Sequence, residues 1–132
     1  MTKKTRGPKR TPAVLTEAEL EMMTVLWRLG PSSVAQIQQE LGTARELAYT
    51  SVSTIVRILE QKGYVTSEKI GRGHVYAAAV AKESYQAASV SQLISKVFDG
   101  TPATLVRSLL ASESLSAGEI SEIKALLARK ED

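Results

Sequence analysis

The sequence predicts a mainly α-helical protein with one small β-hairpin, followed by a helical tail. Three observations predict this architecture. Apolar residues recur at helical spacing in three segments before residue 63. Two short strand-like segments then flank the turn sequence Gly71-Arg72-Gly73. From residue 82 the helical spacing returns. We therefore expect an arm at residues 1–13, a compact domain at residues 14–80 and a helical region at residues 81–132.

Two helix starts can be located from their capping residues. Thr16 and Glu19 have the spacing of a capping box, so a first helix is expected to begin after Thr16 and to end before Gly30. Ser33 and Gln36 repeat that spacing, and they predict a second, shorter helix directly downstream.

The third predicted helix, from Ala48 to Lys62, has two contrasting faces. The apolar stripe, expected to pack on the first two helices, comprises Ala48, Val52, Ile55, Val56 and Leu59. The opposite stripe comprises Thr50, Ser53, Thr54, Arg57 and Gln61. Exposed helical positions usually favour residues with higher helix propensity than Ser and Thr, which favours a binding role for this stripe. The alternative is that Ser and Thr are merely tolerated on an exposed face.

The order of three helices and a hairpin, with a short link between the second and third helices, is that of a winged helix-turn-helix domain. In such a domain the third helix enters the major groove of DNA. Arg57 has the chemistry to donate two hydrogen bonds to guanine, and Gln61 or Ser53 to contact adenine or phosphate.

The hairpin places an arginine at its tip. Gly71 and Gly73 are both expected to permit positive φ around Arg72, which suits contact with phosphate or a narrow minor groove. A solvated loop arginine is the alternative. Lys62 and Lys69 are further candidates for phosphate contacts.

The arm is strongly basic. Its five basic residues are Lys3, Lys4, Arg6, Lys9 and Arg10, and residues 1–12 hold no acidic residue. Because the whole chain carries +3, the remainder carries −2. We expect the arm to be disordered in isolation. Arg6, Lys9 and Arg10 are candidate DNA contacts through counterion release, and a solvated tail that aids solubility is the alternative.

The tail is expected to mediate dimerisation. Its short amphipathic helices are too small to form a useful core alone, whereas a second copy would bury their apolar faces symmetrically. The candidate interface residues are Leu93, Val97, Leu105, Leu109, Ile120, Ile123 and Leu127. The alternative is that these helices fold back on their own winged domain.

Several classes of function are disfavoured. The chain has no cysteine and one histidine, His74, which is expected to be a structural residue on a strand. The sequence has no cysteine nucleophile, no Gly-rich phosphate loop and no metal-ligand cluster, so we expect no enzyme, metal or cofactor. No apolar run approaches the roughly 20 residues of a membrane span, and no secretory signal is evident. A cytoplasmic, nucleoid-associated bacterial protein is expected.

Residues 47–65, together with Leu15–Glu19, Leu26-Trp27 and the helices from Leu93 to Leu127, resemble the penicillinase repressor (BlaI/MecI) family of winged-helix regulators. The resemblance covers about residues 14–130. It implies a homodimeric repressor that binds a palindromic DNA operator and dimerises through its C-terminal helices. By position it places Tyr49, Thr50, Ser51, Ser53 and Thr54 in or near the DNA groove, and Arg72 and Tyr76 in the wing.

Two features depart from the family pattern. Members controlled by sensor proteases are cut at an Asn-Phe bond, but the matching stretch here reads Gly100-Thr101-Pro102-Ala103, which argues against that control. The copper-responsive branch carries C-terminal cysteines, which this chain lacks. Two other functions remain open, a winged helix that binds a protein and a nonspecific architectural DNA binder.

Overall fold

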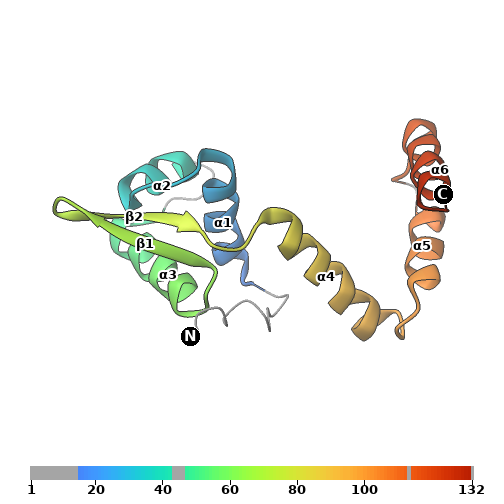
Figure 1. Ribbon diagram of the computed structural model, residues 1–132, viewed down its shortest axis with the longest axis horizontal. Coiled ribbons are helices and arrows are strands. Elements are labelled where there is room, and N and C mark those ends of the chain that lie inside the picture. Colours follow the sequence, from blue (N-terminus) through green and yellow to red (C-terminus); the bar gives the residue numbers. More distant parts are fainter. Residues whose placement is uncertain (1–14, 43–46, 113, 132) are drawn as a thin grey trace. The chain divides into compact units, whose positions relative to one another are not determined.

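The computed structural model describes residues 15–42, 47–112 and 114–131. In this part of the chain it contains six α-helices and one antiparallel two-stranded sheet (Figure 1). The elements are α1 Glu17–Leu29, α2 Val34–Leu41, α3 Tyr49–Gln61, β1 Val65–Ile70, β2 Gly73–Ala78, α4 Lys82–Val97, α5 Pro102–Ala111 and α6 Ala117–Glu131. The predicted mainly helical fold with a hairpin is confirmed. The chain divides into two compact units, of which the first ends at Val90 and the second begins at Ser91.

The predicted capping boxes form at the starts of α1 and α2. The Thr16 hydroxyl accepts a hydrogen bond from the Glu19 backbone N–H at 3.1 Å, and the Glu19 carboxylate accepts one from the Thr16 N–H at 2.9 Å. Ser33 and Gln36 make the same reciprocal pair at 3.1 and 2.8 Å. These bonds satisfy backbone donors that the first turn of a helix leaves without partners.

Helices α1, α2 and α3 surround one core, against which the hairpin packs (Figure 1). On α3, Val52, Val56 and Leu59 are fully buried, and Ile55 is partly buried against them. The predicted apolar stripe is therefore confirmed for these four residues. Ala48 differs: it is the N-cap residue of α3 and is exposed.

The hairpin turn is tighter than the sequence suggested. Ile70 pairs with Gly73, so the loop contains only Gly71 and Arg72, and Gly73 belongs to strand β2. Gly71 has a φ of 63°, whereas Gly73 is not among the residues with positive φ. A glycine with positive φ at the first loop position is what a type II′ turn requires. The expectation of positive φ on both sides of Arg72 was therefore wrong.

The wing is joined to the helices by backbone pairing. Between α1 and α2, the Ser32 N–H donates to the Tyr76 carbonyl at 2.9 Å, and the Tyr76 N–H donates to the Ser32 carbonyl at 2.8 Å. Both residues are buried. This bridge fixes the middle of β2 relative to the start of α2.

The start of α4 belongs to the first unit. Tyr85 is 9% exposed, its ring contacts those of Trp27 and Tyr64, and its hydroxyl accepts a hydrogen bond from the Leu15 N–H at 3.2 Å. The Trp27 indole N–H also donates to the Val80 carbonyl at 2.9 Å. These contacts make Tyr85 part of the core, so the boundary expected between residues 80 and 81 lies before the end of the compact unit.

The second unit contains the end of α4 together with α5 and α6. Pro102 occupies the first turn of α5, and Ser116 and Glu119 form a third capping box before α6. Within the described residues of this unit, no apolar side chain is fully buried. Val97, Leu109 and Leu127 are 61%, 42% and 56% exposed, respectively.

Candidate nucleic-acid interface

A groove of about 460 Å³ lies between α3, the start of α2 and the hairpin. Its lining includes Ser33 and Ala35 at the start of α2, Tyr49, Ser53, Arg57 and Glu60 from α3, and Ser67, Arg72, His74 and Tyr76 from the hairpin. Five of the residues predicted to contact DNA meet here, namely Tyr49, Ser53, Arg57, Arg72 and Tyr76. The groove therefore joins the polar side of the third helix to the wing.

The polar residues of α3 occupy two adjoining strips. At 100° per residue, Tyr49, Ser53 and Glu60 share the strip that lines the groove. A second strip, exposed beside it, comprises Thr50, Thr54 and Gln61. Arg57 lies between the two strips and is exposed, whereas Ser51 is half-buried and does not line the groove.

Arg57 is held along the helix by a neighbour one turn earlier. Its guanidinium donates a hydrogen bond to the Ser53 hydroxyl at 3.2 Å. A guanidinium has five N–H donors in a planar fork, so this bond leaves it able to donate to a planar acceptor pair such as the edge of guanine.

The groove also contains a carboxylate that sequence reasoning did not assign to it. The Ser67 hydroxyl on β1 donates to the Glu60 carboxylate on α3 at 2.7 Å. This bond links the wing to the third helix. Strand alternation offered a signal for Ser67, because it pairs with Tyr76 across the hairpin and the two side chains share one face.

The same face of the hairpin carries two further groups. Lys69 pairs with His74, and both are exposed, with His74 lining the groove. The His74 ring centroid lies 6.3 Å from that of Tyr76. The expectation that His74 is a satisfied structural residue is corrected, because its position near the wing tip leaves it in solvent.

Two residues predicted to contact DNA have other roles in this structure. Tyr76 is only 5% exposed, because its ring packs into the core below the groove. The Lys62 ammonium donates to both oxygens of Glu19, at 3.0 and 2.9 Å, and so links the end of α3 to the start of α1. Tyr76 nevertheless lines the groove, and the Lys62 side chain is 39% exposed.

The Glu19 carboxylate is 7% exposed and remains ionised more readily than usual. Burial alone would raise its pKa, but hydrogen bonds from Lys62 and the Thr16 backbone, with the charge of Lys62, lower that pKa below its ordinary value. Nearby, burial, reinforced by Tyr85 and Glu19, raises the pKa of Tyr64 to about 12. This cluster is structural, and it anchors the third helix from its C-terminal end.

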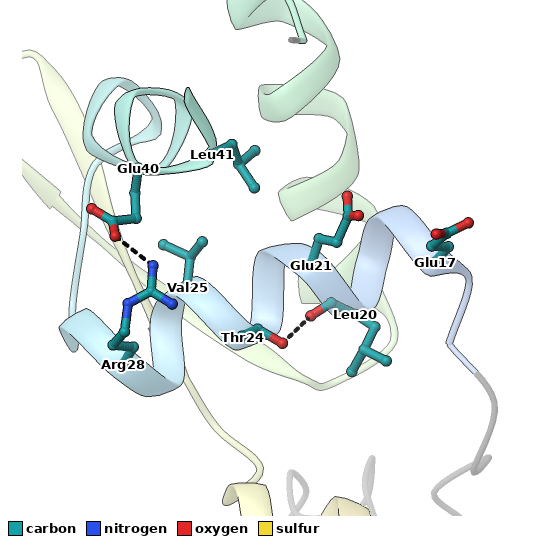
Figure 2. A pocket seen from close by; sticks show the side chains of 8 residues that line it. All are labelled: Glu17, Leu20, Glu21, Thr24, Val25, Arg28, Glu40 and Leu41. Atoms are coloured by element: carbon teal, nitrogen blue, oxygen red, sulfur yellow. Dashed lines mark hydrogen bonds and ion pairs between the residues drawn. The ribbon is translucent and has the colours of Figure 1, made fainter. Parts of the chain in front are cut away.

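A second hollow, of about 390 Å³, lies between α1 and α2 (Figure 2). Three glutamates, Glu17, Glu21 and Glu40, line it with one arginine, Arg28, which forms an ion pair with Glu40. These charges sum to −2, whereas the arginines and the glutamate of the α3 groove sum to +1. Phosphates are therefore repelled from the hollow between α1 and α2 and attracted to the α3 groove.

Arg6, Lys9 and Arg10 lie outside the described residues. Among the residues that the structure does describe, no group of His, Asp and Glu side chains could hold a metal ion. In the same residues, no helix is both long and apolar enough to cross a bilayer.

Comparison with known proteins adds an independent finding. A model of the penicillinase repressor family matches residues 15–129. The penicillinase repressor of Bacillus licheniformis is 26% identical over 119 residues, which cover 90% of this chain and 92% of that protein. The transcriptional regulator BlaI of Mycobacterium tuberculosis (strain ATCC 25618 / H37Rv) is 29% identical over 120 residues, which cover 89% and 85%.

One solved structure agrees at the level of the fold, and a second is similar in sequence. A chain of the hsRosR-S4 complex superimposes with a TM-score of 0.52, at 18% identity, over 88% of this chain and 89% of that chain. The solution structure of the DNA-binding domain of the repressor BlaI is 27% identical over 54% of this chain and 87% of that chain, with a TM-score of 0.49.

Proposed function

This chain belongs to the penicillinase repressor family, and from that premise we propose that it binds a palindromic DNA operator as a homodimer and represses transcription in the cytoplasm. The resemblance inferred from residues 47–65 is confirmed by the family match. A repressor acts by binding, so the chain is not an enzyme.

The convergence of α3 and the wing on one basic groove carries the proposal. Inserted into a major groove, α3 presents the short side chains of Thr50, Ser53 and Thr54, which permit close approach to base edges. Arg57 then reads guanine through its O6 and N7 acceptors. Gln61, exposed at the last turn of α3, reaches a neighbouring base or phosphate.

The wing supplies affinity rather than sequence discrimination. Arg72 is exposed at the hairpin tip and contacts phosphate or the adjacent minor groove, and Lys69 adds a second cation on the groove side of the hairpin. From the sequence alone, Arg6, Lys9 and Arg10 extend these phosphate contacts. Tyr76 positions the strand from within the core, and Lys62 positions α3 through Glu19.

The second unit supports dimerisation. Its exposed leucines, among them Leu109 and Leu127, lie on short helices that do not bury them within the unit. In a homodimer, the apolar helix faces of one copy pack against the same faces of the other copy. The resulting two-fold symmetry suits two half-sites on DNA. The proposed function does not include induction by cleavage at an Asn-Phe bond, because the stretch Gly100-Thr101-Pro102-Ala103, which leads into α5, contains no such pair.

Selection of duplexes from a random DNA library, with sequencing of the bound fraction, tests the proposal. An inverted repeat with half-sites about one helical turn apart is expected. Retention of DNA without any enriched motif would favour an architectural binder. Absence of binding would overturn the proposal and favour a winged helix that recognises a protein.

Arg57→Ala tests the base-reading role on the selected duplex. We expect a loss of about 1–3 kcal/mol on that duplex and a much smaller loss on random DNA. Arg28→Ala is the matched control, because Arg28 is an exposed helical arginine that lines the acidic hollow instead. Equal losses for Arg57→Ala on both DNAs would assign it to phosphate.

A further inference from the structure

His74 is exposed, yet it is not loosely placed. Its strand is fixed two residues later by the backbone pairing of Tyr76 with Ser32, at 2.8 and 2.9 Å. Its imidazole lies beside the Tyr76 ring, with 6.3 Å between ring centroids, and it lines the groove between α3 and the wing. A histidine held at the edge of a basic groove is presented to whatever anion enters that groove.

The charged groups around His74 come from both sides of the groove. Lys69 faces it across the hairpin, and Arg72 and Arg57 line the same groove. Glu60 is the carboxylate of the groove lining, and its oxygen accepts from Ser67. Tyr49 and Tyr76 complete the titratable groups of the lining.

We propose that His74 is a phosphate-contacting residue of the wing that takes up a proton when DNA occupies the groove, so that operator affinity increases as the pH falls. This inference rests on the proposed function, and it adds a residue that neither the sequence patterns nor the family resemblance assigned to DNA.

The direction of the effect follows from the charges. Lys69, Arg57 and Arg72 make the surroundings of His74 net positive and so attract a phosphate to this edge of the groove. A phosphate at the groove edge favours the protonated ring, because it attracts the imidazolium and accepts its hydrogen bond. The complex therefore binds more protons than the free protein does, and lower pH favours the complex.

Few groups of this chain other than His74 are expected to change charge in the pH range of the measurement. His74 is the only histidine and there is no cysteine, so no other side chain ordinarily titrates between about pH 5 and 8. We expect the full-length protein to bind the selected duplex about two- to fivefold more tightly per protomer at about pH 6 than at about pH 8. The slope of log K against log salt should also steepen at the lower pH, by up to about 0.9 per protomer.

Two substitutions at His74 separate charge from shape. His74→Gln, which carries no charge, should remove the pH dependence of both affinity and salt slope. His74→Lys should keep the steeper slope at both pH values. Glu68→Gln is the matched control, because Glu68 pairs with Val75 on the opposite face of the hairpin, and it should retain the pH dependence.

The outcomes distinguish the two proposals. If the wild-type protein selects and binds an operator with pH-independent affinity, or if His74→Gln keeps the wild-type pH dependence, the role of His74 is overturned and the repressor function stands. If the wild-type protein binds no DNA at either pH, the proposed function itself fails.

Discussion

The two compact units differ in how far they bury the apolar faces of their amphipathic helices. In the first unit, amphipathic helices bury most of their apolar side chains in one core, where Ile37 and Leu59 have no exposed surface. In the second, helices of similar pattern leave Leu110 and Leu127 more than half exposed. Helical periodicity thus indicates that a face must be covered, but it does not indicate whether the same chain or another copy covers it.

The contrast has a physical origin in connectivity. In the first unit, the hairpin and the start of α4 return to the three helices and close the core through Tyr64 and Tyr85. Helices α5 and α6 have no comparable set of elements within their unit to pack against. We therefore expect the first unit to be sensitive to loss of volume and the second to be sensitive to loss of its partner.

Ile37→Ala tests the first half of the contrast and has the largest expected effect. Because Ile37 is fully buried, the cavity should lower the free energy of unfolding by about 2–5 kcal/mol. Urea denaturation followed by the fluorescence of Trp27, the only tryptophan, measures it. Leu29→Ala, at a side chain 47% exposed in the same unit, should cost much less. Similar losses for the two variants would mean that the core is not where we place it.

Leu109→Glu tests the second half. If α5 lies in a dimer interface, a buried charge there should raise the dimer dissociation constant at least tenfold, equivalent to about 1.4 kcal/mol or more. Sedimentation velocity across a concentration series measures this. Leu29→Glu is the control, because Leu29 is similarly exposed (47%, against 42% for Leu109) but belongs to the other unit. A wild-type chain that stays monomeric, or equal weakening by both variants, would contradict the assignment.

Glu19→Gln probes the anchor of α3 within the first unit. Glutamine still fits a capping box, so the substitution removes mainly the charge that pairs with Lys62. We expect a loss of about 1 kcal/mol of unfolding free energy at neutral pH, modest because the Lys62 side chain is 39% exposed.

The pH dependence of that loss has a defined sign. Because the pKa of Glu19 is lowered in the folded state, its contribution is present above the ordinary value of 4.5 and disappears as the pH falls through the lower folded value. Wild-type and Glu19→Gln stabilities should therefore converge in acid, whereas Glu68→Gln, at an exposed hairpin position, should follow the wild-type curve. A constant difference at every pH would show that the charge of Glu19 is not responsible.

The features that depend on local residue spacing could be predicted from the sequence. The capping pairs at Thr16 and Ser33 and the two faces of α3 depend on residues three or four positions apart, and the structure has them as expected. The convergence of Arg57 and Arg72 on one groove follows from the winged arrangement as a whole. These features depend on helix geometry and element order, which a single sequence carries.

The features that depend on contacts between residues far apart in the sequence could not be predicted. Tyr85 lies 70 residues from Leu15 and Lys62 lies 43 from Glu19, yet each pair shares a hydrogen bond, and no local pattern indicates such partners. The sequence Gly71-Arg72-Gly73 is compatible with a loop of two or three residues, and this choice sets which side chains face α3. The exposure of His74 and the burial of Tyr76 both depend on packing that follows from that register.

Arg72→Ala against Arg107→Ala gives the smallest expected effect and the most direct comparison of the two units. Both arginines are exposed, one at the wing tip and one on α5. Neither should change unfolding free energy by more than about 0.5 kcal/mol. Only Arg72→Ala should weaken binding on every DNA sequence and reduce the salt slope, by about 0.9 per protomer, because only the wing arginine neutralises a phosphate. An equal reduction of the salt slope for Arg107→Ala would mean that the second unit also contacts DNA. It would contradict the assignment of DNA binding to the first unit alone.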